Sequence, residues 1–363
     1  MRLGGIKSWL MLSLVAVWSL PATAAPSVKQ RLKNSELLVR GAVDIREIEP
    51  FLTEFRRRNP NIELTYIESS TIELYQGMVS GDFADADVIA SSAMDLQVKL
   101  INDGYAQPHV SLETQSLPKR AKWRDEIFAF TYEPAVIAYN HKLLKRIAYE
   151  EELELETRAD MLEFIREHSD NMDGLIGTFD IDSVGVGYLL WSYDSQQTAS
   201  YGRILESFGV HNVRLYSSSK DMLESLNRGD IAFAYNVLGT YANSATHKNP
   251  DVKLLLPTDY TTAIMRTAFI NKDAKNPYAA RRYIDFLLSM SGQQLLADTS
   301  SLSPIRTKVV ANNSDTFFFQ QEHGPIRSIP LGLRLLVMTD ELKREVLIDE
   351  WKSALIHPDS LDH

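Results

Sequence analysis

The 363-residue sequence contains no cysteine. A disulfide framework, a thiolate metal site and a cysteine nucleophile are therefore excluded, and stability has to come from buried apolar surface. Basic residues are in deficit, with 38 Lys and Arg against 48 Asp and Glu and a formal net charge of −10. An acidic chain binds nucleic acid or anionic lipid poorly through bulk electrostatics. We therefore expect no nucleic-acid partner.

Long apolar runs are missing except near the N-terminus. Arg2 and Lys7 start an apolar segment that extends to Leu20, and the small residues of PATA at 21–24 follow it. The apolar part is shorter than the roughly 18 to 20 residues that cross a bilayer. We therefore interpret residues 1–24 as a cleavable signal peptide, which predicts export and leaves a net charge of −12.

Motifs of the common enzyme and metal classes are also lacking, since no H-E-x-x-H, Walker or dinucleotide-binding pattern occurs. Ser217 and Lys220 fit the S-x-x-K motif of serine acyl-transferring enzymes, but SSSKDMLESL is also typical of a helix N-cap. Asp180 and Asp182 could serve as the acid and base of a secreted hydrolase, or could simply cap a loop. We expect a protein that is not an enzyme and needs no cofactor or metal, with a secreted hydrolase as one alternative.

Strand and helix patterns alternate along the chain. Strand-like stretches at 36–43, 61–68 and 86–91 are each followed by a helical pattern, and a second series includes extended stretches at 126–140 and 174–181. This order predicts an α/β fold with largely parallel sheets and helices on both faces. The loops at the carboxyl ends of such strands are the usual ligand positions.

Small polar residues stand at three predicted helix starts. Ser70 and Glu73 form a capping box in ESSTIEL, and ASSAMD and IDSVGVG repeat the arrangement. Each residue could do no more than begin its helix. Because helix N-termini attract anions, however, three starts at one cleft predict a phosphate or carboxylate site. The candidate binding residues are Ser69, Ser70, Thr71, Ser91, Ser92, Asp182, Ser183 and Gly185.

The stretch IAFAYNVLGTYANSA at 231–245 adds two phenols and an amide where a strand ends. Tyr235 and Asn236 could orient hydroxyl or carbonyl groups of a ligand, and Tyr241 could pack over it. The alternative is that these groups are satisfied structural hydrogen-bonding partners.

Several modest motifs occur in a specific order between residues 36 and 306, among them FLTEFRRRNPNIELTYIESSTIEL, ADVIASSAMDLQVKLINDGY, LNRGDIAFAYNVLGTYA and SLSPIR. This order resembles the extracellular solute-binding proteins of ferric-iron-type ABC importers. The resemblance implies a periplasmic, monomeric type II binding protein whose two hinged lobes, each a mixed, mostly parallel sheet flanked by helices, close on a solute. It also implies delivery to an ABC permease or a sensor histidine kinase. NVLGTYA and IGTFDIDSVGVGYLL are most similar to the phosphoglycerate-sensing and hexose-phosphate-binding branch.

On this resemblance, lobe 1 comprises residues 25–108 and 259–310, and lobe 2 comprises 109–258, of which 126–138 cross back to lobe 1. Residues 311–363 are expected to form a helical segment packed on the lobes.

Ferric members of the family bind iron through two adjacent tyrosines. The matching positions here are Val237 and Leu238, while Asp44 replaces a first-loop histidine and Ser92 stands near the acidic position. Iron binding is therefore the alternative. We expect a small anionic or polar solute, with an organic phosphate or carboxylate favoured and with Asp44 added to the candidate residues. Val184, where a phosphate site would offer a further donor, leaves a polyol open.

Overall fold

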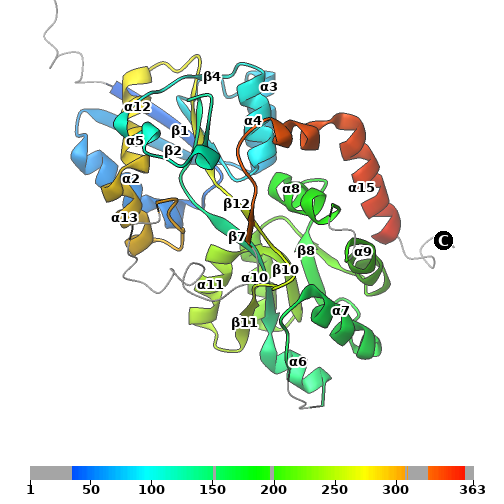
Figure 1. Cartoon of the computed structure of the whole chain (residues 1–363). Helices are drawn as coiled ribbons and strands as arrows, with labels where there is room; N and C mark the ends of the chain where they lie inside the picture. The colour runs from blue at the N-terminus through cyan, green and yellow to red at the C-terminus, as the bar shows by residue number, and fades with distance from the viewer. Residues whose placement is uncertain (1–34, 150–152, 197–199, 307–308, 310–325, 356–363) are drawn as a thin grey trace, which may run out of the picture.

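The computed structural model describes residues 35–149, 153–196, 200–306, 309 and 326–355. The predicted signal peptide, residues 1–24, lies outside this part of the chain. Two sheets, each flanked by helices, form two lobes (Figure 1).

The sheet of the first lobe has the strand order β2-β1-β3-β13-β6-β5, with β4 paired to β13. β1, β2 and β3 are parallel, and β13 runs antiparallel to its neighbours. The strands are β1 (Ser35–Gly41), β2 (Ile62–Glu68), β3 (Val88–Ser91), β4 (Ala106–Gln107), β5 (Lys122–Trp123), β6 (Ile127–Ala129) and β13 (Thr267–Asn271). The helices are α2 (Ile45–Arg58), α3 (Thr71–Ser80), α4 (Met94–Asn102), α5 (Leu112–Gln115), α12 (Pro277–Leu288) and α13 (Met290–Thr299).

The sheet of the second lobe has the order β14-β12-β7-β10-β8-β9, with β11 paired to β7. β8 is parallel to β9 and β10, whereas β7 is antiparallel to β10, β11 and β12. The strands are β7 (Glu133–Asn140), β8 (Ile176–Phe179), β9 (Arg214–Tyr216), β10 (Phe233–Leu238), β11 (Val252–Leu255), β12 (Thr261–Ile264) and β14 (Ile326–Ser328). The helices are α6 (His141–Ile147), α7 (Arg158–Glu167), α8 (Gly185–Asp194), α9 (Tyr201–Val210), α10 (Ser219–Arg228) and α11 (Gly239–Lys248).

The chain passes from the first sheet to the second between β6 and β7, returns between β12 and β13, and enters the second sheet again at β14. The extended stretch predicted at 126–140 therefore divides between the two sheets. The predicted limits place residues 259–310 in lobe 1, but β12 pairs with β7 of the second sheet, so the return crossing lies after Ile264.

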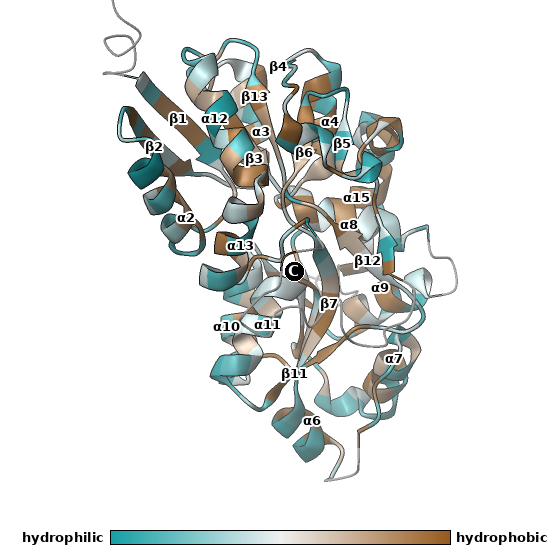
Figure 2. Ribbon diagram, turned by 60° about the vertical axis from the view of Figure 1, so that its left-hand side comes forward, coloured by the Kyte–Doolittle hydropathy of each residue, from teal (hydrophilic) through white to brown (hydrophobic). Residues whose placement is uncertain are grey.

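The core of each lobe forms where apolar helix faces cover a sheet (Figure 2). In α2 the spacing of Ile48, Phe51, Leu52 and Phe55 places all four on the buried face. In the second lobe Trp191 of α8 stacks on Phe208 of α9 and meets another tryptophan, Trp351, edge to face.

Trp351 belongs to a C-terminal segment that contacts both lobes. A 3₁₀ segment, η3 (Leu333–Thr339), packs on α4, and α15 (Glu341–Leu355) packs on α9 (Figure 1). Lys352 adds an ion pair to Asp182 before α8, with 2.7 Å between Nζ and Oδ2. Among the described residues, no helix is both long and apolar enough to span a membrane.

Candidate ligand-binding site

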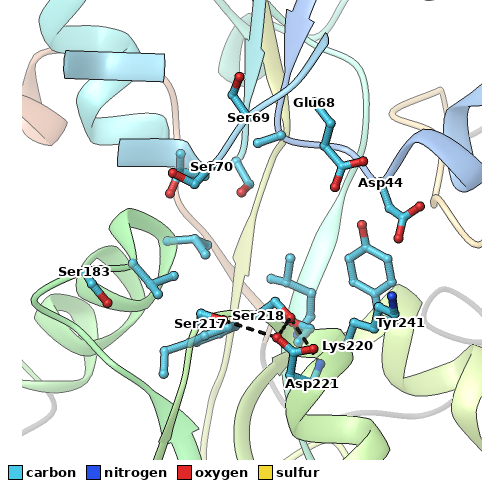
Figure 3. Close-up of a pocket in the computed structure, with 18 of the residues that line it drawn as sticks. Asp44, Glu68, Ser69, Ser70, Ser183, Ser217, Ser218, Lys220, Asp221 and Tyr241 are labelled. Carbon is cyan, nitrogen blue, oxygen red and sulfur yellow. Dashed lines mark hydrogen bonds between the residues drawn. The ribbon is translucent and has the colours of Figure 1, made fainter. Parts of the chain in front are cut away.

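A cavity of about 730 Å³ lies between the two lobes (Figure 3). The loops that line it follow the carboxyl ends of β1, β2 and β3 in the first lobe and of β8, β9 and β10 in the second. This is the position at which open α/β sheets bind ligands, because several strands end and several helices begin there. The volume suits a small organic molecule.

The starts of α3 and α10 at this cavity each hold a carboxylate. In the capping box of α3, Ser70 Oγ accepts from the Glu73 amide at 3.2 Å and Glu73 Oε2 accepts from the Ser70 amide at 2.8 Å. At α10, Ser218 Oγ accepts from the Asp221 amide at 3.1 Å and donates to Asp221 Oδ2 at 2.8 Å. Each carboxylate offsets part of the positive potential of its helix start.

The starts of α8 and α11 differ, because neither has an acidic residue in its first turn or a side-chain cap. Their first N–H groups therefore carry the partial positive charge of the helix end without an acidic residue in the helix's own first turn, although Asp180 accepts from Ser183 before α8 and Glu133 accepts from Thr240 of α11. Ser183 and Val184 precede α8, Leu238 precedes α11, and all three line the cavity.

Asp44 caps α2 at the upper rim of the cavity. It accepts from the Arg46 amide at 2.9 Å and pairs with the Arg46 guanidinium, with 3.0 Å between Oδ2 and Nη2. The hydrogen bond from the Arg46 side chain lowers the pKa of Asp44 against the opposing effect of burial, and Lys220 contributes from the second lobe. Asp44 is therefore a carboxylate at neutral pH.

Glu68 and Lys220 are cavity residues that pattern analysis of the sequence did not single out for binding. Glu68 Oε2 accepts from the Ile45 amide at 2.9 Å. Neither Glu68 nor Lys220 has an ion-pair partner within 4 Å in the part of the chain that the structure describes. Figure 3 shows them on opposite sides of the cavity, Glu68 on the first lobe and Lys220 on the second.

Arg266, at the second crossing, is the third such residue. Only 2% of its surface is exposed, its Nε donates to Glu133 Oε1 at 3.1 Å, and its guanidinium lies 5.4 Å from the Tyr241 ring centroid. Burial opposes its charge, but Tyr241 and Glu133 outweigh burial and raise the pKa of Arg266. Its buried Nη2 has no hydrogen-bond partner among the described residues. Arg266 thus lines the cavity while one of its donors has no partner among the described residues.

Tyr241, one of the candidates from the sequence, lines the cavity with its phenol turned toward Asp44 and Glu68 (Figure 3). Burial raises the pKa of this phenol, so it remains a hydroxyl that can donate at neutral pH. Arg266, which lies beside Tyr241, could have been found from the sequence, because it is a lone arginine inside the apolar run TTAIMRTAFIN.

Tyr235 and Asn236 do not line the cavity but belong to a buried network in the second lobe. Tyr235 Oη accepts from Arg158 Nε and donates to Asp194 Oδ2, both at 3.0 Å, while Asn236 Nδ2 donates to the same Asp194 oxygen at 2.7 Å. Tyr260 supplies a third donor to Asp194 at 2.9 Å. The structure therefore gives these two side chains structural partners.

Three further candidates also lie outside the cavity lining. Ser91 is buried and accepts from the Ala93 amide at 3.2 Å, and Asp182 faces Lys352 of α15. Gly185 touches the first lobe, because a Cβ there would lie 3.1 Å from Leu96 and Thr71. Seven of the predicted residues do line the cavity, namely Asp44, Ser69, Ser70, Thr71, Ser92, Ser183 and Tyr241.

The residues of the hydrolase alternative act as caps. Asp180 accepts from the Asp182 amide at 3.1 Å and from Ser183 Oγ at 2.6 Å. Ser217 lines the cavity and donates to Asp221 at 3.2 Å, while Ser218 is the N-cap of α10.

Residues 44–294 match the family described as bacterial extracellular solute-binding protein. The chain belongs to this family. It is also similar to the solved structure of the substrate-binding protein of an ABC transporter from Agrobacterium tumefaciens, with 32% identity, a TM-score of 0.80, and coverage of 91% of this chain and 97% of that one. No curated protein matches the sequence.

Two more distant structures show the fold alone. AfuA from Actinobacillus pleuropneumoniae, with fructose-6-phosphate bound, has 14% identity, a TM-score of 0.71, and coverage of 88% of this chain and 98% of that one. Iron-bound HitA from Pseudomonas aeruginosa has 12% identity, a TM-score of 0.68, and coverage of 89% and 100%.

The family resemblance and the two-lobed type II fold predicted from the sequence are thus confirmed. As a member of the extracellular solute-binding family, the protein binds a solute for an ABC importer, and the family implies a periplasmic location.

Proposed function

We propose that this solute-binding protein captures a small organic anion, a phosphate or carboxylate that also carries hydrogen-bond donors, and presents it to an ABC permease. The observation that carries the proposal is Arg266, whose buried Nη2 lacks a partner among the described residues and belongs to a residue that lines the cavity. A buried guanidinium that keeps donors for a ligand suits the oxygen atoms of a phosphate or carboxylate.

The carboxylates of the cavity explain why the ligand needs donors of its own. Asp44, Glu68, Glu73 and Asp221 line the cavity together with two basic residues, Lys220 and Arg266. A bare anion would meet these carboxylates as like charges. A ligand whose hydroxyl or amino groups face Asp44 and Glu68 turns the same carboxylates into acceptors.

Ferric iron fits the cavity less well. Tyr241 is the only tyrosine among its described lining residues, and no described group of three or more His, Asp or Glu residues could hold a metal ion. Hard ferric iron favours several oxygen ligands in one shell, and an organic solute fills about 730 Å³ better than one ion.

Ligand capture would proceed by closure of the lobes. A solute that touches Glu68 of the first lobe and Lys220 of the second favours the closed state only through contacts made to both. We propose that the receptor works as a monomer with an ABC permease. A sensor kinase remains the alternative partner, and no described feature favours it.

The test is a thermal-shift screen followed by calorimetry. Sugar phosphates, phosphoglycerates, di- and tricarboxylates and ferric citrate would be offered to the purified full chain. A true ligand at a hundredfold excess over Kd stabilises the folded state by about 2.7 kcal/mol. We expect a hit among the organic anions, whereas a response to ferric citrate alone would contradict the proposal.

A pair of buried arginines provides the matched variants. Arg266→Lys keeps the charge beside Glu133 but loses the guanidinium donors, so we expect ligand affinity to fall at least about tenfold. Arg158→Lys makes the same change at a buried arginine outside the cavity and should preserve affinity. Equal affinity losses in both variants would show that Arg266 acts through the fold.

A further inference from the structure

Glu68 and Lys220 are two opposite charges that face one cavity from opposite lobes without an ion-pair partner among the described residues. The other cavity charges are accounted for locally. Asp44 pairs with Arg46, Arg266 pairs with Glu133, and Glu73 and Asp221 cap helices.

Closure of the lobes changes the surroundings of both groups. Water leaves the cavity, and a carboxylate or ammonium that loses water without gaining a partner is costly. Lys220 attracts Asp44 across the cavity, and Glu68 attracts Arg46, but Asp44 and Arg46 already satisfy each other. Closure therefore calls for a positive group beside Glu68 and a negative group beside Lys220.

We infer that the ligand is a zwitterion, with an ammonium group bound by Glu68 and a phosphate or carboxylate bound by Lys220 and Arg266. The inference rests on the proposed function and narrows its ligand class. Tyr241, whose phenol is turned toward Glu68 and Asp44, borders the ammonium end (Figure 3). Glu68 is then the specificity-determining residue, because it distinguishes an amine from a hydroxyl at the same place on the ligand.

The chemical basis is the difference between two hydrogen bonds. An ammonium donates to a carboxylate in a charge-assisted bond, which is roughly twice as strong as a bond between neutral groups. A hydroxyl at that position donates without bringing charge, so Glu68 would enter the closed cavity uncompensated. The Oε1 atom of Glu68 is the available acceptor, because Oε2 already accepts from the Ile45 amide.

The test compares probes that differ only in this group. 2-Aminoethyl phosphate and its homologues with three to five methylenes would be titrated calorimetrically into the full chain, each against the matching hydroxyalkyl phosphate. A parallel series of ω-amino and ω-hydroxy carboxylates distinguishes the two kinds of anion. We expect the best amino compound to bind at least about tenfold more tightly than its hydroxy counterpart.

Two variants test whether Glu68 produces the preference for amino compounds and whether Lys220 binds the anionic group. Glu68→Gln keeps an acceptor for the Ile45 amide. It should reduce the ratio of amino-compound affinity to hydroxy-compound affinity to a value between about 1 and 2, and it should change the affinity for the hydroxy compounds by less than about twofold. Lys220→Met should weaken both series at least about tenfold. Glu63→Gln in β2 and Lys142→Met in α6 are exposed controls outside the cavity and should change neither series.

Equal binding of amino and hydroxy compounds would overturn the inference and leave the proposed function standing. An amine preference that persists in Glu68→Gln would also overturn it, as would failure of every amino compound to bind. If Glu68 and Lys220 instead pair directly, the unliganded protein would scatter as a closed form at low angle, and Glu68→Gln would open it. The Arg266→Lys comparison decides the proposed function independently.

Discussion

Replacing Asn236 by Leu tests whether this amide serves the fold or the ligand. Asn236 is 4% exposed and donates to Asp194 Oδ2 at 2.7 Å. It also has a φ of 60°, at the irregularity where β10 shifts its register against β7. The substitution removes a donor from a buried carboxylate and places a bulky side chain in the left-handed region.

The two effects add to a large cost. Loss of a hydrogen bond to a charged group costs about 1.5 to 3 kcal/mol, and the left-handed conformation costs a non-glycine residue about 1 to 2 kcal/mol. We therefore expect Asn236→Leu to lower the free energy of unfolding by about 2.5 to 5 kcal/mol. That is a substantial part of the 5 to 15 kcal/mol typical of a folded domain.

Urea unfolding of the unliganded protein measures this loss, and calorimetry measures ligand binding in the same variant. Asn236→Gly separates the causes, because glycine loses the amide but adopts the positive φ freely. It should recover about 1 to 2 kcal/mol relative to Asn236→Leu. An unchanged urea midpoint together with lost ligand affinity would refute the structural role and would show that Asn236 serves ligand binding.

Burial raises the pKa of Asp95 to about 6, so its folded-state penalty is absent below about pH 4, grows as pH rises from about 4 to about 6, and is complete above that. Asp95→Asn should therefore raise the free energy of unfolding by about 1 to 3 kcal/mol at pH 7.5 and by little at pH 4. Urea unfolding at both pH values measures this difference, and equal gains in stability at the two pH values would contradict the prediction. A Cβ on Gly209 would lie 2.1 Å from the Ala354 carbonyl oxygen of α15. Gly209→Ala should thus lower the free energy of unfolding by about 1 to 2 kcal/mol, because the new methyl group displaces α15. Gly202→Ala, which points into open space on the same helix α9, should instead raise the free energy of unfolding, and equal effects of the two substitutions in urea unfolding would contradict the role of the Gly209–Ala354 contact.

The alternation of strands and helices could be predicted because it follows from local periodicity. The exact positions of the crossings between the sheets could not be predicted in this way. TTAIMRTAFIN reads as one apolar run, yet its two halves form β12 and β13 in different sheets, with Met265 and Arg266 between them. Likewise β6 and β7 lie within one extended stretch and belong to different lobes. The partner sheet of a strand depends on tertiary contacts that periodicity does not encode.

The same distinction holds for the cavity. Ser70, Ser92 and Ser183 were placed at its wall by local helix-start signals. Glu68 and Lys220 carry no such signal, because an exposed charge has the same appearance in sequence whether it faces a cavity or open water. Tyr235 was expected at the ligand, but its buried partner Arg158 stands 77 residues away in sequence.

The position of β13 has a consequence for how the protein is built. This strand joins β3 to β6 and is the link between the parallel strands and the β5–β6 pair in the first sheet. Every strand of the second sheet except β14 precedes it in the chain. A chain synthesised from its N-terminus can therefore assemble most of the second lobe while the first is still in two parts. Pairing of β13 with β3 must then close a loop that contains an almost complete lobe, which makes it a slow, non-local step. The solute cavity, which needs both lobes, can form only after that step.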